Sequence, residues 1–142
     1  IKEGYERGLY EINPINKSLN KNILSMAYTP GVGAVCLEIQ KRPELVDELT
    51  LRGRSVAIVT QGACFKNEKI EAGKMVPVVD WCIAQIKYYS CVDGFPFIIR
   101  EGANITNVLK DLSNTYGAIL IMDPGLEFSE KEMPTDVAIL RQ

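Results

Sequence analysis

The chain has 142 residues, of which 46% are hydrophobic, 24% charged and 8% aromatic. This is the composition of a globular domain, and the length is enough for one domain with a core that needs no disulfide or metal. The net charge of −2, from 16 basic and 18 acidic residues, argues against an extended basic surface for nucleic acid or anionic lipid. The absence of histidine excludes Ser-His-Asp and Cys-His catalysis and every His-ligated metal site.

The cysteines and the N-terminal segment indicate a compartment. Cys36, Cys64, Cys82 and Cys91 include no Cys-x-x-Cys pair, which argues against a zinc site. Three of them lie in apolar segments, where a free thiol usually packs as a small core residue. No apolar stretch has the length of a membrane span, and residues 1–22 lack the pattern of a secretory signal. We expect a cytoplasmic protein with reduced thiols, and an association with the cytoskeleton is a narrower option.

In chain order, a polar segment comes before the first helices. Residues 1–24 predict an N-terminal arm with room for a short strand. The turn at 29–31 (Thr-Pro-Gly) then opens a helix that includes Cys36 and closes before Pro43. Pro43 and Glu44 start a second short helix, because proline is favoured at the first helical position and acidic residues near the positive end of the helix dipole.

Four apolar runs predict the strands of a single domain over residues 25–142. They are 55–60 (SVAIVT), 95–99 (FPFII), 118–122 (AILIM) and 137–140 (VAIL). Apolar residues at helical spacing predict helices over 73–92 and 104–116, and Gly117 ends the second. This alternation predicts an α/β fold with a mostly parallel sheet flanked by helices. The first run is continuous, as in strands buried on both faces, and the last should pair beside 118–122.

Ligands of such sheets bind beyond the carboxyl ends of the strands, where Gly62, Asp123 and Gly125 stand in this chain. The glycines could bring backbone amides to an anion, but glycines at these positions more often make turns. Asp123 has the place of a catalytic or metal-binding acid. Its neighbour is Met122 and not a second acid, so the favoured interpretation is an Asp-Pro-Gly turn.

Other candidate motifs are weaker. Residues 31–33 (Gly-Val-Gly) resemble the start of a dinucleotide loop, but Cys36 replaces the third glycine and no apolar strand precedes, so a helix start is favoured. Lys74 and Lys87 flank the 73–92 helix, where a desolvated lysine could be a general base and a solvated charge is commoner. Tyr28, just before the 29–31 turn, could donate a proton, although an interior tyrosine with a bonded hydroxyl is the plainer interpretation.

The stretch 26–39 (MAYTPGVGAVCLEI) closely resembles the signature of the malic enzyme N-terminal domain. The resemblance continues through 41–44 (KRPE), 51–60 (LRGRSVAIVT) and 92–97 (VDGFPF). Malic enzymes oxidatively decarboxylate malate to pyruvate with NAD or NADP and a divalent metal. Their active site lies between this domain and a following nucleotide-binding domain. On this resemblance, Tyr28 has the position of the general-acid tyrosine.

At other positions the chain departs from the family pattern. The resemblance implies that Cys82 replaces the general-base lysine, Cys64 the malate-binding arginine, and Met122-Asp123 the metal-binding Glu-Asp pair. A thiol cannot do the work of an ammonium, and a dicarboxylate without arginine loses its bidentate partner. Without the acid pair, the metal that polarises the substrate is poorly held. Where the family continues into a nucleotide-binding domain, this sequence reads Arg141-Gln142.

We therefore expect a malic-enzyme-like pseudoenzyme without a catalytic, cofactor or metal site. It would serve as a structural or protein-binding module in a larger assembly, with proteins as partners, neither nucleic acid nor membrane, and a homodimer as an option. Two alternatives stay open. The chain could be a fragment or subunit of an NAD(P)-dependent malate-oxidising enzyme, or a small-carboxylate sensor that keeps Tyr28, Gly62 and Asp123 around a remodelled pocket.

Overall fold

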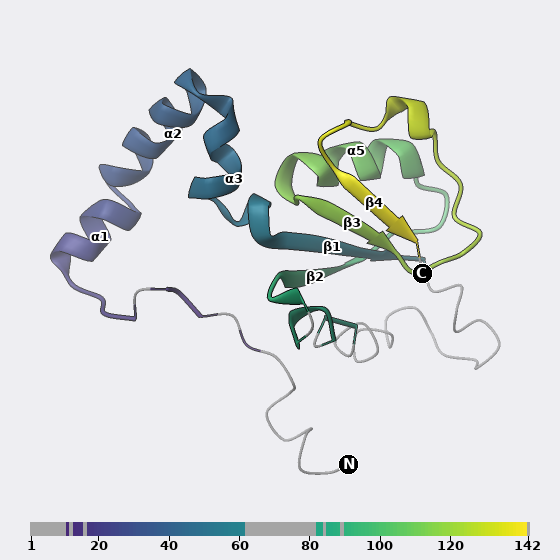
Figure 1. Cartoon of the computed structure of the whole chain (residues 1–142), viewed down its shortest axis with the longest axis horizontal. Helices are drawn as coiled ribbons and strands as arrows, with labels where there is room; N and C mark the ends of the chain where they lie inside the picture. Colours follow the sequence, from purple (N-terminus) through teal and green to yellow (C-terminus); the bar gives the residue numbers. More distant parts are fainter. Residues whose placement is uncertain are drawn as a thin grey trace, which may run out of the picture.

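The computed structural model describes residues 11, 13–15, 17–61, 82–83, 85–88 and 90–141. Four strands form one parallel sheet in the order β2-β1-β3-β4 (Figure 1). The strands are β1 (Ser55–Thr60), β2 (Asp93–Ile98), β3 (Ala118–Ile121) and β4 (Ala138–Arg141). The predicted α/β fold is confirmed, and each predicted strand is found with its ends shifted by no more than two residues.

Strand β1 is central, and its side chains pack on both faces of the sheet. Successive residues of a strand point to opposite sides. Ala57 and Val59 therefore join a core cluster on one face, together with Ile119 and Ile121 of β3. On the other face, Ile58 packs in a second cluster. The continuous apolar run is thus explained by burial on both sides.

Helix α5 (Ile105–Thr115) covers the first face. The Asn104 side chain caps it by accepting a hydrogen bond from the backbone N–H of Asn107 at 3.0 Å. Leu109 is fully buried against the sheet, which contributes about 1.5–3 kcal/mol. After the helix, a Cβ on Gly117 would lie 2.4 Å from the carbonyl oxygen of Arg52, so only glycine fits. The helix predicted over 104–116 is confirmed.

Strand β4 lies at the edge of the sheet and pairs in parallel with β3, as expected for the last apolar run. Val137, just before the strand, is buried, whereas Leu140 is 55% exposed. The apolar run is thus only partly buried at this edge. The Arg141 guanidinium donates to the Leu126 carbonyl oxygen at 2.9 Å and lies over the Phe128 ring.

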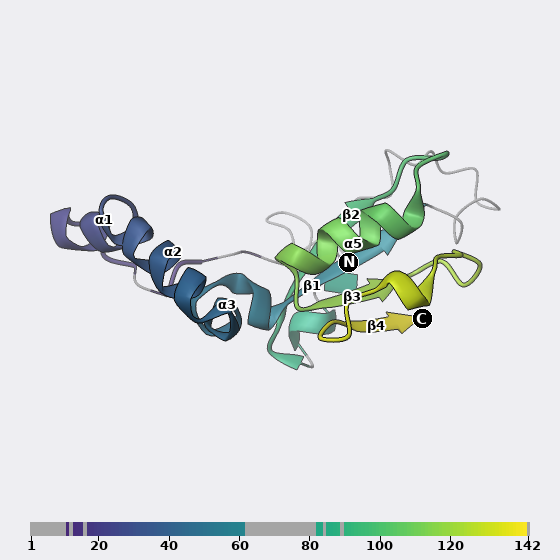
Figure 2. The same ribbon diagram turned by 90° about the horizontal axis from the view of Figure 1, so that it is seen from above.

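The N-terminal part forms two short helices that follow one another roughly end to end and extend away from the sheet (Figures 1 and 2). It consists of α1 (Lys21–Ala27) and α2 (Gly31–Lys41), and we call residues 21–41 the helical arm. Neither helix has a buried residue. The polar segment expected through residue 24 becomes helical earlier, because the Asn20 side chain accepts a hydrogen bond from the Ile23 N–H. The described residues among 11–20 form no strand.

A short connection joins the helical arm to β1. It contains η1 (Pro43–Leu45), α3 (Val46–Leu49) and η2 (Leu51–Arg54), which confirms the short helix predicted at Pro43. No helix in the described part of the chain is long and apolar enough to cross a membrane.

Arg52 fixes this connection to the sheet. Its buried guanidinium pairs with Asp47 of α3 and, at 2.9 Å, with Asp136 of the turn before β4. It also donates to the Ser113 carbonyl oxygen near the end of α5. The pKa of Arg52 is raised, mainly by its hydrogen bond with Asp47. This bond and the one with Asp136 together outweigh the burial of the side chain, which lowers the pKa. One charged side chain thus ties together three segments at the base of the helical arm.

Candidate functional site

The carboxyl ends of β1 and β3 meet at Asp123, which is 2% exposed. Its Oδ1 accepts a hydrogen bond from the Thr60 hydroxyl at 2.7 Å, and its Oδ2 accepts one from the Gln61 backbone N–H at 2.6 Å. A buried carboxylate is tolerated when its oxygens are bonded in this way. Asp123 therefore does more than begin a turn, because it joins the two strand ends.

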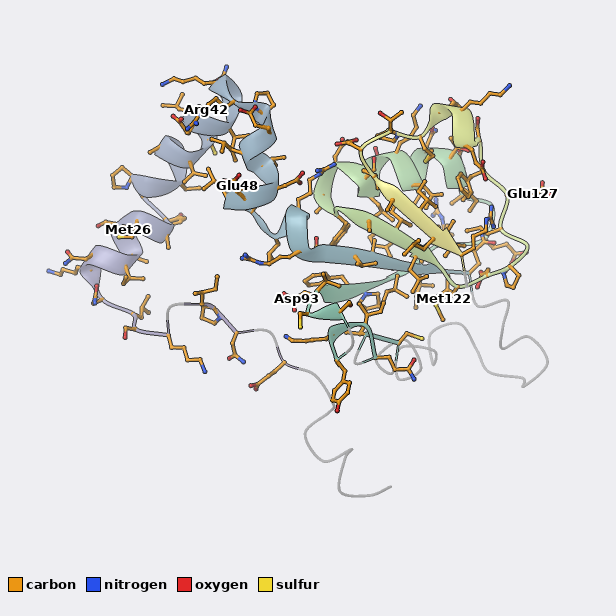
Figure 3. All side chains as sticks on the ribbon, in the orientation of Figure 1. Met26, Arg42, Glu48, Asp93, Met122 and Glu127 are labelled. Carbon is orange, nitrogen blue, oxygen red and sulfur yellow. The ribbon has the colours of Figure 1, made fainter. Side chains whose placement is uncertain are left out.

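Two further positions that the resemblance links to catalysis, Cys82 and Met122, lie on the second face of the sheet. Cys82 and Met122 are both half-buried and both pack against the cluster of Ile58 and Ile83. Figure 3 shows Met122 at the end of the sheet near the last turns of the chain. These two side chains thus contribute to packing on that face.

These residues do not fit a divalent metal. Mg²⁺ and Mn²⁺ prefer several oxygen ligands, whereas a methionine thioether is a soft ligand. Both oxygens of Asp123 already accept hydrogen bonds from the protein. Within the described ranges, no three His, Cys, Asp or Glu side chains come close enough to hold an ion. The described end of the sheet offers one engaged carboxylate and no partner acid beside it.

Tyr28 lies elsewhere. It follows α1 directly, is 68% exposed, and uses its backbone N–H and carbonyl oxygen to join α1 to α2. The interior-tyrosine interpretation is therefore wrong. The helical arm is separated from the carboxyl ends of the strands in both ribbon views, and Figure 3 places Met26 and Met122 far apart. The structure thus places Tyr28, which follows α1, away from Asp123 at the carboxyl ends of the strands.

Several other candidates have other roles or lie outside the described residues. Gly62, Cys64 and Lys74 lie outside them, as does most of the 73–92 segment, of which 82–83, 85–88 and 90 are helical. Lys87 pairs with Asp93 at the start of β2, at 3.1 Å. The 31–33 glycine motif forms the first turn of α2, and Gly125 lies in an exposed turn, as their plainer interpretations predict.

The exposure of the cysteines differs from the expectation that a thiol in an apolar segment packs in the core. Cys36 and Cys91 are exposed, and only Cys82 among the described cysteines is partly buried. Cys36 lies on α2, which has no buried residue. Cys91 lies in the link between the described helical residues and β2, with a left-handed φ of 56°. An apolar sequence environment therefore does not bury these two side chains.

The helical arm has an unusual surface that the sequence motifs did not indicate. Residues 22–37 contain no Asp, Glu, Lys or Arg. Leu24, Met26 and Leu37 are nevertheless half-exposed or more on these two helices. The uncharged stretch was the available signal, since a solvated surface normally carries charged side chains.

The curated proteins that are similar to this chain are malic enzymes. The NADP-dependent malic enzyme of Salmonella typhimurium is 31% identical over 121 residues, which cover 82% of this chain and 16% of that enzyme. The bifunctional malic/malolactic enzyme of Bacillus subtilis is 31% identical over 107 residues, or 73% of this chain and 26% of the enzyme. No protein-family model matches the chain. The chain therefore spans a quarter or less of the length of most of these relatives.

Solved structures of malic enzymes have the same fold over nearly the whole chain. The NAD-dependent malic enzyme of Thermotoga maritima matches with a TM-score of 0.83 and 22% identity, covering 99% of this chain and 42% of that one. The malic enzyme of Pyrococcus horikoshii matches with a TM-score of 0.75 and 30% identity, over 84% and 28% of the two chains. The helical arm and the sheet are thus parts of one known domain fold.

Proposed function

The chain belongs to the malic enzyme family, with the fold of its N-terminal domain, and we propose that it is a catalytically degenerate member that works as a protein-binding module. Two groups of residues support the proposal. At the ends of the strands, positions that the resemblance links to catalysis contribute to packing and hydrogen bonding. On the helical arm, apolar side chains are presented to the surroundings.

The loss of catalysis is argued from the chemistry of single positions. Cys82 supplies a half-buried thiol, packed on Ile58, at the position where the resemblance implies an ammonium group. Met122 supplies a thioether in place of an acid, and the carboxylate of Asp123 is engaged with Thr60 and Gln61. A proton acceptor and a hard-cation ligand are both replaced by groups that cannot do their work.

The observation that carries the binding role is the helical arm without a buried residue. Its helices have seven and eleven residues, and helices this short are marginal in water unless an apolar face is packed. Met26 is 68% and Leu37 60% exposed, so these apolar side chains are not buried against the described part of the chain. Exposed apolar side chains on an uncharged stretch of this length support contact with another protein.

Charged residues at both ends of this uncharged stretch support a protein as the partner. The uncharged residues 22–37 are bordered by Lys21 on one side and by the Glu38–Arg42 ion pair on the other. An apolar centre with a charged rim is the usual anatomy of a protein interface. The partner we propose is another protein of a larger assembly, with an apolar surface that packs over Met26 and Leu37.

The test adds charge to the helical arm. The variant Met26→Lys/Leu37→Lys introduces two ammonium groups at exposed positions, and Asn107→Lys/Asn114→Lys adds the same charge to the exposed side of α5 as a control. Native assemblies isolated from cells would be sized by gel filtration with light scattering. We expect the arm variant to leave the assembly and the control to remain in it. An arm variant that remains fully assembled would contradict the binding role.

A second candidate function is favoured by a different observation. Tyr28 keeps the position of the general-acid tyrosine, and the relatives are whole enzymes several times longer than this chain. On this account the chain is one part of a malate-oxidising enzyme, and the rest of that enzyme covers the helical arm. The chemistry of Cys82 and Met122 distinguishes the two accounts, because it does not depend on what else the protein contains.

A further inference from the structure

We propose that Asp123 is a structural clamp that holds the carboxyl ends of β1 and β3 together, at a position where the resemblance implies a metal ligand. This inference goes beyond the protein-binding role, because it concerns the opposite end of the sheet from the helical arm. It stands whether or not the helical arm has a partner.

The clamp begins where the backbone pairing of the strands stops. The parallel register of β1 and β3 runs from Val56 opposite Ala118 to Val59 opposite Ile121. One more backbone bond follows, from the Met122 N–H to the Val59 carbonyl oxygen at 2.9 Å. Beyond it, the Asp123 side chain supplies the next two connections, to Thr60 and Gln61. A carboxylate thus continues the strand-to-strand bonding after the ladder ends.

The third strand segment is tied to the same point. The Ile99 N–H, just after β2, donates to the Thr60 carbonyl oxygen at 2.9 Å. Thr60 therefore uses its carbonyl oxygen toward the β2 side and its hydroxyl toward Asp123. Because Thr60 is 1% exposed, water cannot replace these partners without opening the sheet. The ends of three strands are held by one buried cluster.

The carboxylate is engaged on both oxygens, by the Thr60 hydroxyl and by the Gln61 N–H. A hard cation would in addition need several further oxygen ligands beside Asp123. The adjacent side chain, Met122, packs on the Ile58 cluster and offers no oxygen. A group that a metal would hold in an active relative is here held by the protein itself.

The experiment is thermal unfolding of the full chain, followed by circular dichroism, with EDTA or with millimolar Mn²⁺. Thr60→Val removes one donor while keeping the shape, and Asp123→Asn removes the charge. Glu127→Gln is the matched control, since it removes the same charge from an exposed carboxylate nearby. We expect Thr60→Val to lower Tm by about 3–8 °C and Asp123→Asn by at least as much, with the control within about 1 °C.

The double variant and the metal complete the test. The decrease in Tm of Asp123→Asn/Thr60→Val should be smaller than the sum of the decreases of the two single variants, because both substitutions break the same contact. Mn²⁺ should leave every Tm unchanged. Single variants that melt like the control would overturn the clamp, as would a Mn²⁺-induced rise in Tm that Asp123→Asn abolishes. If Asp123→Asn does not fold, Thr60→Val alone decides, since it removes only a hydroxyl.

Discussion

The sheet and the helical arm use the same kinds of residues in opposite ways. In the sheet, Ile119 is completely buried on the face that α5 covers with Leu109, and Ile58 is completely buried on the other face. In the helical arm, Met26 and Leu37 are mostly exposed although the stretch around them carries no charge. The buried core of the described chain therefore lies in the sheet with α5, whereas the composition of the helical arm fits the contact with another protein that we propose. Arg52 connects the base of the helical arm to the sheet, and we call Arg52 with its ion pairs to Asp47 and Asp136 the joint between the two regions.

The largest effect should follow removal of the last strand, by truncation before Pro134. The truncated chain loses β4, the buried Val137 and the Asp136 partner of Arg52, and it exposes the edge of β3. We expect a loss comparable to a typical total stability of about 5–15 kcal/mol, and hence unfolding or aggregation. Circular dichroism and sedimentation would measure it. An unchanged Tm and solubility would show that the sheet does not need its edge strand.

A matched pair of leucine substitutions compares the two regions directly. Leu109→Ala leaves a cavity in the core and should lower the free energy of unfolding by about 3 kcal/mol. Leu37→Ala, the same change on the helical arm, should alter it by no more than about 0.5 kcal/mol in the isolated chain. Urea unfolding gives both values. Equal losses would mean that the helical arm is part of the folded core.

Substitution of the joint should have a smaller effect. Arg52→Met keeps the length of the side chain but leaves Asp47 and Asp136 without their cation. Because both carboxylates are at least half exposed and can return to water, we expect a loss of about 1–2 kcal/mol, less than for a fully buried pair. Comparison with Lys110→Met, which removes the more exposed Lys110–Glu132 pair, controls for the loss of a surface charge.

The pH dependence of this joint has a definite sign. Asp47 and Asp136 raise the pKa of Arg52, so the contribution of the charged guanidinium is complete below its unfolded pKa and disappears only in strong alkali. The difference in unfolding free energy between wild type and Arg52→Met should therefore stay constant from about pH 7 to pH 10. A difference that decreases steadily across this range would contradict a role through the charged side chain.

The smallest effect concerns thiol reactivity. In the native protein, an alkylating reagent should label Cys36 and Cys91 rapidly and the half-buried Cys82 about tenfold more slowly. Mass spectrometry of the peptides gives the rate for each site, and labelling in urea should remove the difference. Cys82 labelling as fast as Cys36 in the native state would indicate an open pocket on that face of the sheet.

The sequence predicted what local patterns determine. The apolar runs gave the strands, and the cap at Asn104 with Gly117 bounded α5. Helix α1 was not predicted, because its start depends on one side-chain cap in a polar segment. The contact of Thr60 with Asp123 spans 63 residues, and that of Arg52 with Asp136 spans 84, so no local sequence pattern predicts these contacts.

The direction of the helical arm was equally beyond local patterns. On the resemblance, Tyr28 and Cys82 both have the positions of catalytic groups, which implies a shared site. Their separation in the fold depends on how the base of the helical arm is fixed, and the buried Arg52 holds that base through partners on distant segments. A single sequence shows Arg52 and its partners but does not show that they are in contact in the folded protein.

The most direct test of the central claim, a retained fold with a lost active site, is malate-dependent reduction of NAD by a chimera. In this chimera, the chain replaces the matching segment of the NAD-dependent malic enzyme 1 of Bacillus subtilis, which is 31% identical to it over 105 residues. The rest of that relative then supplies whatever this chain lacks. The account predicts a folded chimera with no malate-dependent NADH formation, beside an active parent enzyme. NADH formation that requires malate and is abolished by Tyr28→Phe would contradict it.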